Sequence, residues 1–280
     1  MIVDAHHHLW DLAVRPQDWL APDRLAPIRR TFSVDDLAAV TGAAGVSATV
    51  VVQAIPVAAE TPELLAVAAT SELIVGVVGW VDLTDAAAGD QIAELRAGPG
   101  GDRLVSIRHP VQSEADPGWL ARADVRRGLR AVADAGLAYD LLVTAVQLPA
   151  AVAVVRDLPE LRFVLDHLAK PLIAAGELEP WAHDLRELAA ADNVAAKISG
   201  LITEADWAQW TVADLAPYVQ VALAAFGPER LMFGSDWPVS LLAGEYGRWL
   251  DTARELVAEL SPVEQDRFFA GSAREWYRLP

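Results

Sequence analysis

The feature that most constrains the fold of this chain is a series of eight short apolar runs along its 280 residues. Most of the runs are rich in Val, Ile, Leu or Phe and are nearly continuous. Such runs are typical of strands that are buried on both faces of a parallel sheet. The runs are Ile2–His8, Ala48–Ile55, Ile74–Asp82, Leu104–Pro110, Ala138–Thr144, Arg162–Leu168, Val194–Gly200 and Leu231–Pro238.

Helical patterns separate the runs, and several carry recognisable start signals. The segment Ser261-Pro262-Val263-Glu264 is a capping-box pattern that predicts a C-terminal helix from about residue 262. Eight strands that are each followed by a helix, at roughly thirty-residue spacing, predict an α/β fold of the (β/α)8 TIM-barrel type. A doubly wound sheet is the alternative, because periodicity does not prove closure. Other helices are expected from Ser33, from Thr61, from Thr84 to about Ala97, and over Arg122–Ala135, Gln147–Asp157, Pro180–Ala191, Asp206–Phe226 and Tyr246–Leu260.

We expect residues 1–280 to form a single domain, since there is no low-complexity tract or linker. The longest connection without a helical pattern, residues 9–31, follows the first strand and carries Trp10 and Trp19. A long loop in a compact domain is usually functional, so this one is predicted to cover the barrel mouth. The alternative is a flap that serves packing alone.

Composition excludes several classes of function. There is no cysteine, which excludes disulfides and thiolate catalysis. The net charge of −17 disfavours nucleic acid as a partner. The N-terminus lacks the features of a signal peptide, and the longest uncharged run, residues 43–59, is too short to cross a bilayer. We therefore expect a soluble cytoplasmic protein without a membrane partner, as a monomer or homodimer.

Polar residues end the predicted strands, where the catalytic groups of a barrel lie. His6 and His8 are two positions apart, so their side chains share one face, while His7 points the other way. Such a pair can chelate a divalent metal or donate to one oxyanion, although a hydrogen-bonded pair is the structural alternative. Asp236 ends the last run, and in a closed barrel the last strand neighbours the first. This adjacency favours a functional site.

The other strand ends leave more alternatives open. An ammonium in the apolar run around Lys197 needs a partner, either a substrate oxygen or a structural ion pair. Arg108 has the same two interpretations, and His167 could instead be a core histidine. The roles of Lys170, which lies just beyond its strand, and His109 stay open. Gln53 could orient a substrate hydroxyl, and Trp10, Trp80 and Trp237 could offer faces to a sugar ring, but amide networks and packing explain these residues equally well.

Six motifs follow one another along the chain. They are Asp4-Ala5-His6-His7-His8-Leu9-Trp10, Val52-Gln53-Ala54 with Glu60-Thr61, Ile107-Arg108-His109, Asp166-His167-Leu168-Ala169-Lys170-Pro171, Lys197-Ile198-Ser199-Gly200-Leu201 and Phe233-Gly234-Ser235-Asp236-Trp237-Pro238. In this order the motifs resemble the sugar-lactonase branch of the amidohydrolase superfamily, the amidohydrolase 2 type. The resemblance runs from residue 2 to about residue 238, with a similar tail near Gly271, and it is specific for the family and much less so for the substrate.

The resemblance implies a (β/α)8 hydrolase that opens a cyclic ester such as L-fucono- or L-rhamnonolactone. Asp236 would be the general base that deprotonates the attacking water. The imidazoles of His6, His8 and His167 would polarise the lactone carbonyl, directly or through one metal ion. The residues assigned to substrate binding are Arg108, Lys197, Gln53, Trp80 and Trp237. A carboxylate and nearby hydrogen-bond donors suit this chemistry, because it needs a deprotonated water and a stabilised oxyanion.

One departure from the wider superfamily bears on cofactors. Binuclear relatives bridge two metals with a modified lysine on strand 4, whereas here that strand ends in Arg108-His109. We therefore expect one divalent ion, zinc by preference, bound by His6, His8 and Asp236 with His167 as the fourth ligand. A metal-independent site is the alternative.

Two other functions remain open. A metal-dependent decarboxylase of the amidohydrolase 2 type would need a tightly held metal and an aromatic acid. A non-catalytic sugar-acid binding protein would keep the pocket without turnover. Carbon dioxide release and binding without hydrolysis, respectively, would identify them.

Overall fold

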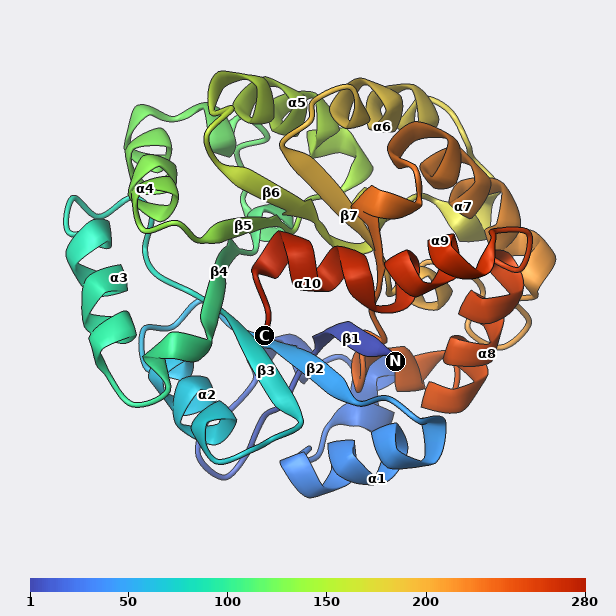
Figure 1. Ribbon diagram of the computed structural model, residues 1–280, viewed down its shortest axis with the longest axis horizontal. Helices are drawn as coiled ribbons and strands as arrows, with labels where there is room; N and C mark the ends of the chain where they lie inside the picture. Colours follow the sequence, from blue (N-terminus) through green and yellow to red (C-terminus); the bar gives the residue numbers. More distant parts are fainter.

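The computed structural model describes all 280 residues as a ring of eight strands surrounded by helices (Figure 1). Neighbours in the ring follow sequence order from β1 to β8, and all the paired strands are parallel. The predicted (β/α)8 barrel in a single domain is therefore confirmed. The strands are β1 (Val3–His7), β2 (Ala48–Val52), β3 (Ile74–Gly79), β4 (Leu104–His109), β5 (Ala138–Leu141), β6 (Arg162–Leu165), β7 (Val194–Ile198) and β8 (Leu231–Phe233).

Ten α-helices accompany the strands, and none is both long and apolar enough to cross a membrane. Two predictions were wrong at their starts: the helix expected from Thr84 begins at Ala88, and the helix expected from Asp206 begins at Val212. The latter begins there because Thr211 and Asp214 form a capping box at that point. The helices are α1 (Val34–Ala44), α2 (Glu60–Ala69), α3 (Ala88–Ala97), α4 (Ala123–Asp134), α5 (Leu148–Asp157), α6 (Trp181–Ala189), α7 (Val212–Phe226), α8 (Tyr246–Leu256), α9 (Pro262–Asp266) and α10 (Ser272–Tyr277).

The strands are shorter than the apolar runs that predicted them. β6 ends at Leu165 and β8 at Phe233, and the chain then turns. His167 and Asp236 lie in these turns, with positive φ angles of 53° and 54°. Their side chains are therefore aimed by turn geometry, and not by the alternation of a strand.

A carboxylate joins the two ends of the sheet. Between β1 and β8 the main chain contributes hydrogen bonds from His8 N to Trp237 O and from Asp236 N to His6 O, both 2.7 Å long. The buried Asp4 Oδ1 also accepts from the backbone N–H groups of His6 (3.1 Å) and Ser235 (2.8 Å). These contacts hold the residues that carry His6, His8 and Asp236 side by side.

The C-terminal helical segment closes the other end of the barrel. α9 and α10, with one π turn between them, lie across the ring of strands in Figure 1. Trp276 and Tyr277 pack against small side chains such as Ala5, Ala138 and Ala195. The C-terminal segment therefore closes the end of the barrel at which the strands begin. The open end is the one that carries the carboxyl ends of the strands.

Candidate active site

A cavity of about 380 Å³ opens beyond the carboxyl ends of the strands. It receives side chains from the segments that follow most of the strands and Trp19 from the long loop 9–31. Its wall combines titratable groups with apolar ones, as ligand sites usually do. The lining residues are His8, Trp19, Ala54, Ile55, Pro56, Arg108, Pro110, Gln112, Ser113, Leu142, His167, Lys170, Asp236 and Val239.

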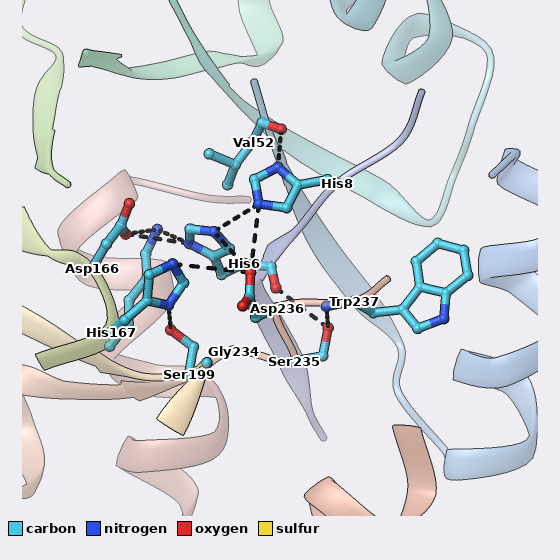
Figure 2. Close-up of polar contacts among 12 residues, drawn as sticks. His6, His8, Val52, Asp166, His167, Ser199, Gly234, Ser235, Asp236 and Trp237 are labelled. Carbon is cyan, nitrogen blue, oxygen red and sulfur yellow. Dashed lines mark hydrogen bonds and ion pairs between the residues drawn. The ribbon is translucent and has the colours of Figure 1, made fainter. Parts of the chain in front are cut away.

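Three imidazoles converge on one carboxylate oxygen (Figure 2). His8, His167 and Asp236 line the cavity, whereas His6 is fully buried beside them. The Nε2 atoms of His6, His8 and His167 lie 3.7, 3.5 and 3.9 Å from Asp236 Oδ1. The Nε2 atoms of His6 and His8 are 3.2 Å apart, whereas His7 points away and contacts Thr49. The structure thus brings together the four residues to which the sequence pointed.

Each of the three imidazoles has its second nitrogen engaged, and that of His6, Nδ1, lies 3.1 Å from Lys197 Nζ. His8 Nδ1 lies 2.7 Å from the carbonyl oxygen of Val52, and since a carbonyl can only accept, this nitrogen carries the proton. In a neutral His8, Nε2 is therefore a bare lone pair, which suits a metal and cannot donate to a lactone carbonyl. His167 Nδ1 contacts Ser199 Oγ at 2.9 Å. Such partners orient the rings, as they do for histidines that bind metals.

Burial sets the protonation states of these groups. It lowers the pKa of His6 well below its usual value and that of His167 to about 4, so both are neutral at pH 7. Burial opposes ionisation of Asp236, but positive charges outweigh it and lower the pKa of this carboxyl, first that of His167 in its protonated form at acidic pH, and also that of Lys170. The cavity thus holds an ionised carboxylate beside neutral imidazoles.

These donors fit a metal ion. His6, His167 and Asp236 each offer one ligand atom, and the three atoms lie within 4.8 Å of one another. His8 Nε2 lies 3.2 Å from His6 Nε2 and 3.5 Å from Asp236 Oδ1. All four predicted ligands therefore lie in one cluster. Neutral imidazoles and a carboxylate are the ligands that zinc takes in proteins.

Lys197 was expected to bind substrate oxygens, but its ammonium does not reach the cavity. Its side chain is fully buried, and Nζ lies 2.6 Å from Asp140 Oδ2, 2.9 Å from Asp166 Oδ1 and 3.1 Å from His6 Nδ1. Although burial opposes it, Lys197 helps to hold the pKa of Asp166 well below its usual range. Lys197 is therefore part of a buried ion network under His6, and not a substrate-binding group.

Arg108 reaches the cavity wall but is heavily engaged. Nη1 donates to Asp166 Oδ2 at 3.0 Å, and Nη2 donates to the side-chain oxygen of Gln53 at 2.8 Å and to its backbone oxygen. Gln53 does not line the cavity, so its expected contact with substrate is replaced by support of Arg108.

The two tryptophans expected to bind substrate lie elsewhere. Trp80 lines a different cavity, between α2 and α3, and its indole donates to His109 Nδ1 at 3.0 Å. His109 also stacks on Trp119, which makes it a packing residue. Trp237 is buried against Phe32 and points away from the imidazoles in Figure 2. Trp80, His109 and Trp237 therefore serve packing in this structure.

Sequence reasoning underrated two features of this site. Asp166 entered the sequence analysis only as part of the motif around His167, yet it contacts Arg108, Lys197 and His6. Lys170 was left without a role just beyond its strand, yet it lines the cavity. The available signal was its position three residues after His167, which places both on one side of a tight turn.

Gly200 gives a first prediction, because it has no room for a side chain. Its φ is +64°, and an added Cβ would lie 2.7 Å from His167 Nδ1 and 2.9 Å from Asp236 Oδ2. Gly200→Ala should lower kcat by about 100-fold, the usual effect of displacing reacting groups by about an ångström. Steady-state kinetics on a lactone of the class that the sequence resemblance implies measures this.

Gly176→Ala is the matched control. Gly176 has a φ of +69° and open space around its Cβ position, so the backbone cost is the same without crowding. Equal kcat values for the two variants would show that the crowding of His167 and Asp236 is unimportant.

Glu60 gives a second prediction, on stability. Its buried carboxylate accepts from the N–H groups of Ala54 and Ile55 in the cavity wall, and burial raises its pKa to about 7, against an ordinary 4.5. The folded state therefore binds this proton more tightly, and stability should fall as pH rises from about 4.5 to 7, by about 3 kcal/mol.

Glu60→Gln should remove this slope. Urea unfolding of both proteins across that pH window measures it, and the difference between them isolates Glu60 from other buried carboxyls. The exposed Glu63→Gln in the same helix should leave the slope intact. A Glu60→Gln curve parallel to wild type would contradict the raised pKa.

Comparisons with known proteins agree with this geometry. The amidohydrolase family model matches residues 3–279. The L-fucono-1,5-lactonase of Burkholderia ambifaria is 41% identical over 281 residues, covering 99% of this chain and 95% of the relative. That of Burkholderia multivorans is 35% identical over 295 residues, covering 99% and 96%. A crystal structure of an amidohydrolase from B. multivorans with bound zinc matches with a TM-score of 0.94 at 36% identity, over 100% of both chains.

Proposed function

Because this chain belongs to the amidohydrolase family and is a sugar-lactone hydrolase by its full-length similarity to curated lactonases, we propose that its substrate is L-fucono-1,5-lactone or a close analogue such as an L-rhamnonolactone. The similarity to two L-fucono-1,5-lactonases supports this substrate. The observation that supports hydrolysis is the ionised carboxylate of Asp236 on the cavity wall, faced by three imidazole nitrogens. Ester hydrolysis needs a base of this kind beside groups that stabilise an oxyanion.

In the proposed mechanism Asp236 accepts a proton from the water that attacks the lactone carbonyl. The neutral His167 lines the cavity and can donate an N–H group to the oxyanion, and the buried neutral His6 lies behind the same carboxylate. When the ring C–O bond breaks, the protonated Asp236 returns its proton to the leaving alkoxide. No covalent nucleophile takes part.

A zinc-like divalent ion would be held by His6, His8, His167 and Asp236. When bound, such an ion polarises a carbonyl as a Lewis acid. The bare Nε2 of His8 is the feature of this chain that favours it. Arg108 contributes positive charge at the wall in either case.

We also propose that loop 9–31 covers the cavity mouth. Trp19 from this loop lines the cavity, and the Trp10 indole joins the two ends of the loop by donating a 2.7 Å hydrogen bond to the backbone oxygen of Arg30. The loop would then limit access of bulk water to the reacting ester.

Acid release from a panel of sugar lactones, with purified protein, tests the substrate. We expect turnover of L-fucono-1,5-lactone well above spontaneous hydrolysis. Turnover of none of the lactones would contradict the proposal, and binding without turnover would identify a non-catalytic sugar-acid binding protein. Metal analysis of protein purified without chelator decides whether an ion is held.

A further inference from the structure

Lys170 is the more weakly paired of the two cations that line the cavity. Its side chain is 26% exposed, and its closest carboxylate oxygen, Glu204 Oε1, is 3.7 Å away, beyond hydrogen-bond distance. Arg108, the other cation, is 3% exposed and donates to Asp166 and Gln53. The Lys170 ammonium therefore keeps its donors for a ligand.

The backbone is built to put this ammonium in the cavity. The four residues from His167 to Lys170 have φ angles of 53°, 50°, 59° and 53°, although none is glycine. Such strain clusters at functional sites and persists only where surrounding contacts enforce it. Here Leu168 and Ala169 are fully buried, and the Trp181 indole donates to Leu168 O at 2.6 Å. The result is that His167 and Lys170 both line the cavity.

The proposed reaction creates a negative charge at this place. Water adds its oxygen to the carbonyl carbon, the ring C–O bond breaks, and the ring oxygen leaves as a hydroxyl. The new carboxylic acid then loses its proton to solvent. The neutral lactone thus becomes an anion in the same cavity as the Asp236 carboxylate, and two like charges at close range repel.

We propose that Lys170 forms an anion subsite, in which its ammonium binds the carboxylate of the open-chain sugar acid. The inference rests on the proposed lactone hydrolysis for the origin of that carboxylate. Glu204 keeps the ammonium beside the cavity without neutralising it at hydrogen-bond distance. Burial raises the pKa of Glu204, which further weakens its competition with a ligand carboxylate. The cavity accordingly distinguishes the sugar acid from an uncharged polyol of the same carbon skeleton.

Calorimetric binding of two probes tests the subsite. L-Fuconate carries the carboxylate, and L-fucitol has a hydroxymethyl group in its place. Lys170→Met should raise the Kd of L-fuconate by at least about tenfold and leave that of L-fucitol within about twofold. Lys170→Arg should recover most of the affinity, because it restores the charge. Arg130→Met, an exposed cation on α4, is the control and should change neither Kd.

The outcomes separate this inference from the proposed function. Equal affinities of wild type and Lys170→Met for L-fuconate, an equal loss of both probes, or no L-fuconate binding by wild type would overturn the subsite. Lactone turnover is measured on the same preparations. L-Fuconate binding that depends on Lys170, in a protein that opens no lactone, would support the subsite and contradict the hydrolase.

Discussion

Asp236→Asn is expected to lower kcat on the substrate lactone by about 10²–10⁴-fold, the contribution of a positioned general base. The amide has the size of the carboxylate but cannot take the proton of the attacking water. The backbone hydrogen bond from residue 236 to His6 O does not involve the side chain, so the turn that carries it should be retained. Stopped assays of acid release, with the thermal midpoint of each protein, measure both effects.

Glu204→Gln is the matched control for this variant. It removes another partly buried carboxylate near the cavity, 3.7 Å from Lys170, which no step of the proposed mechanism uses. Its kcat should stay within about threefold of wild type. An Asp236→Asn protein with near-normal kcat would remove Asp236 from the role of base.

Lys197→Met should lower the free energy of unfolding by about 3–5 kcal/mol, because it breaks a buried ion pair from one side. Lys197 and Arg108 together balance Asp140 and Asp166 inside the barrel. Without Lys197 one buried carboxylate has no counter-charge. Either this carboxylate is protonated, or the desolvated charge destabilises the folded state. Urea unfolding at pH 7 measures the loss.

The chain offers a close control, since its only other lysine is Lys170. Lys170→Met removes a partly exposed ammonium whose ion pair is 3.7 Å long, and should cost less than about 1 kcal/mol. Similar losses for the two variants would mean that the network under His6 contributes little to stability.

Much of the fold and part of the site were predictable from local pattern. Continuous apolar runs identify strands that are buried on both faces, and each run begins within one residue of its strand. Alternation along a strand placed His6 and His8 on one side and His7 on the other. The adjacency of the first and last strands then brought in Asp236, which lies within 3.7 Å of both ring nitrogens.

The failures concern groups whose partners come from elsewhere in the chain. Lys197 was expected at substrate, but Asp140 and Asp166 on neighbouring strands claim its charge. Trp80 was expected at substrate, but the helices around it enclose a different cavity. No property of either residue's own segment indicates which of these environments surrounds it.

The amino-acid sequence by itself determined the barrel, the order of its strands and the gathering of imidazoles and a carboxylate at one end, because these follow from periodicity and from neighbour relations around a closed ring. Only the tertiary structure decided which charged side chains are paired in the protein interior and which face the cavity. Lys197 and Lys170 have the same side chain. Lys197 is buried and paired with two carboxylates, whereas a turn with left-handed backbone angles places Lys170 at the cavity. The physical reason is that the desolvation of a charge depends on every element packed around it, and not on its own stretch of chain.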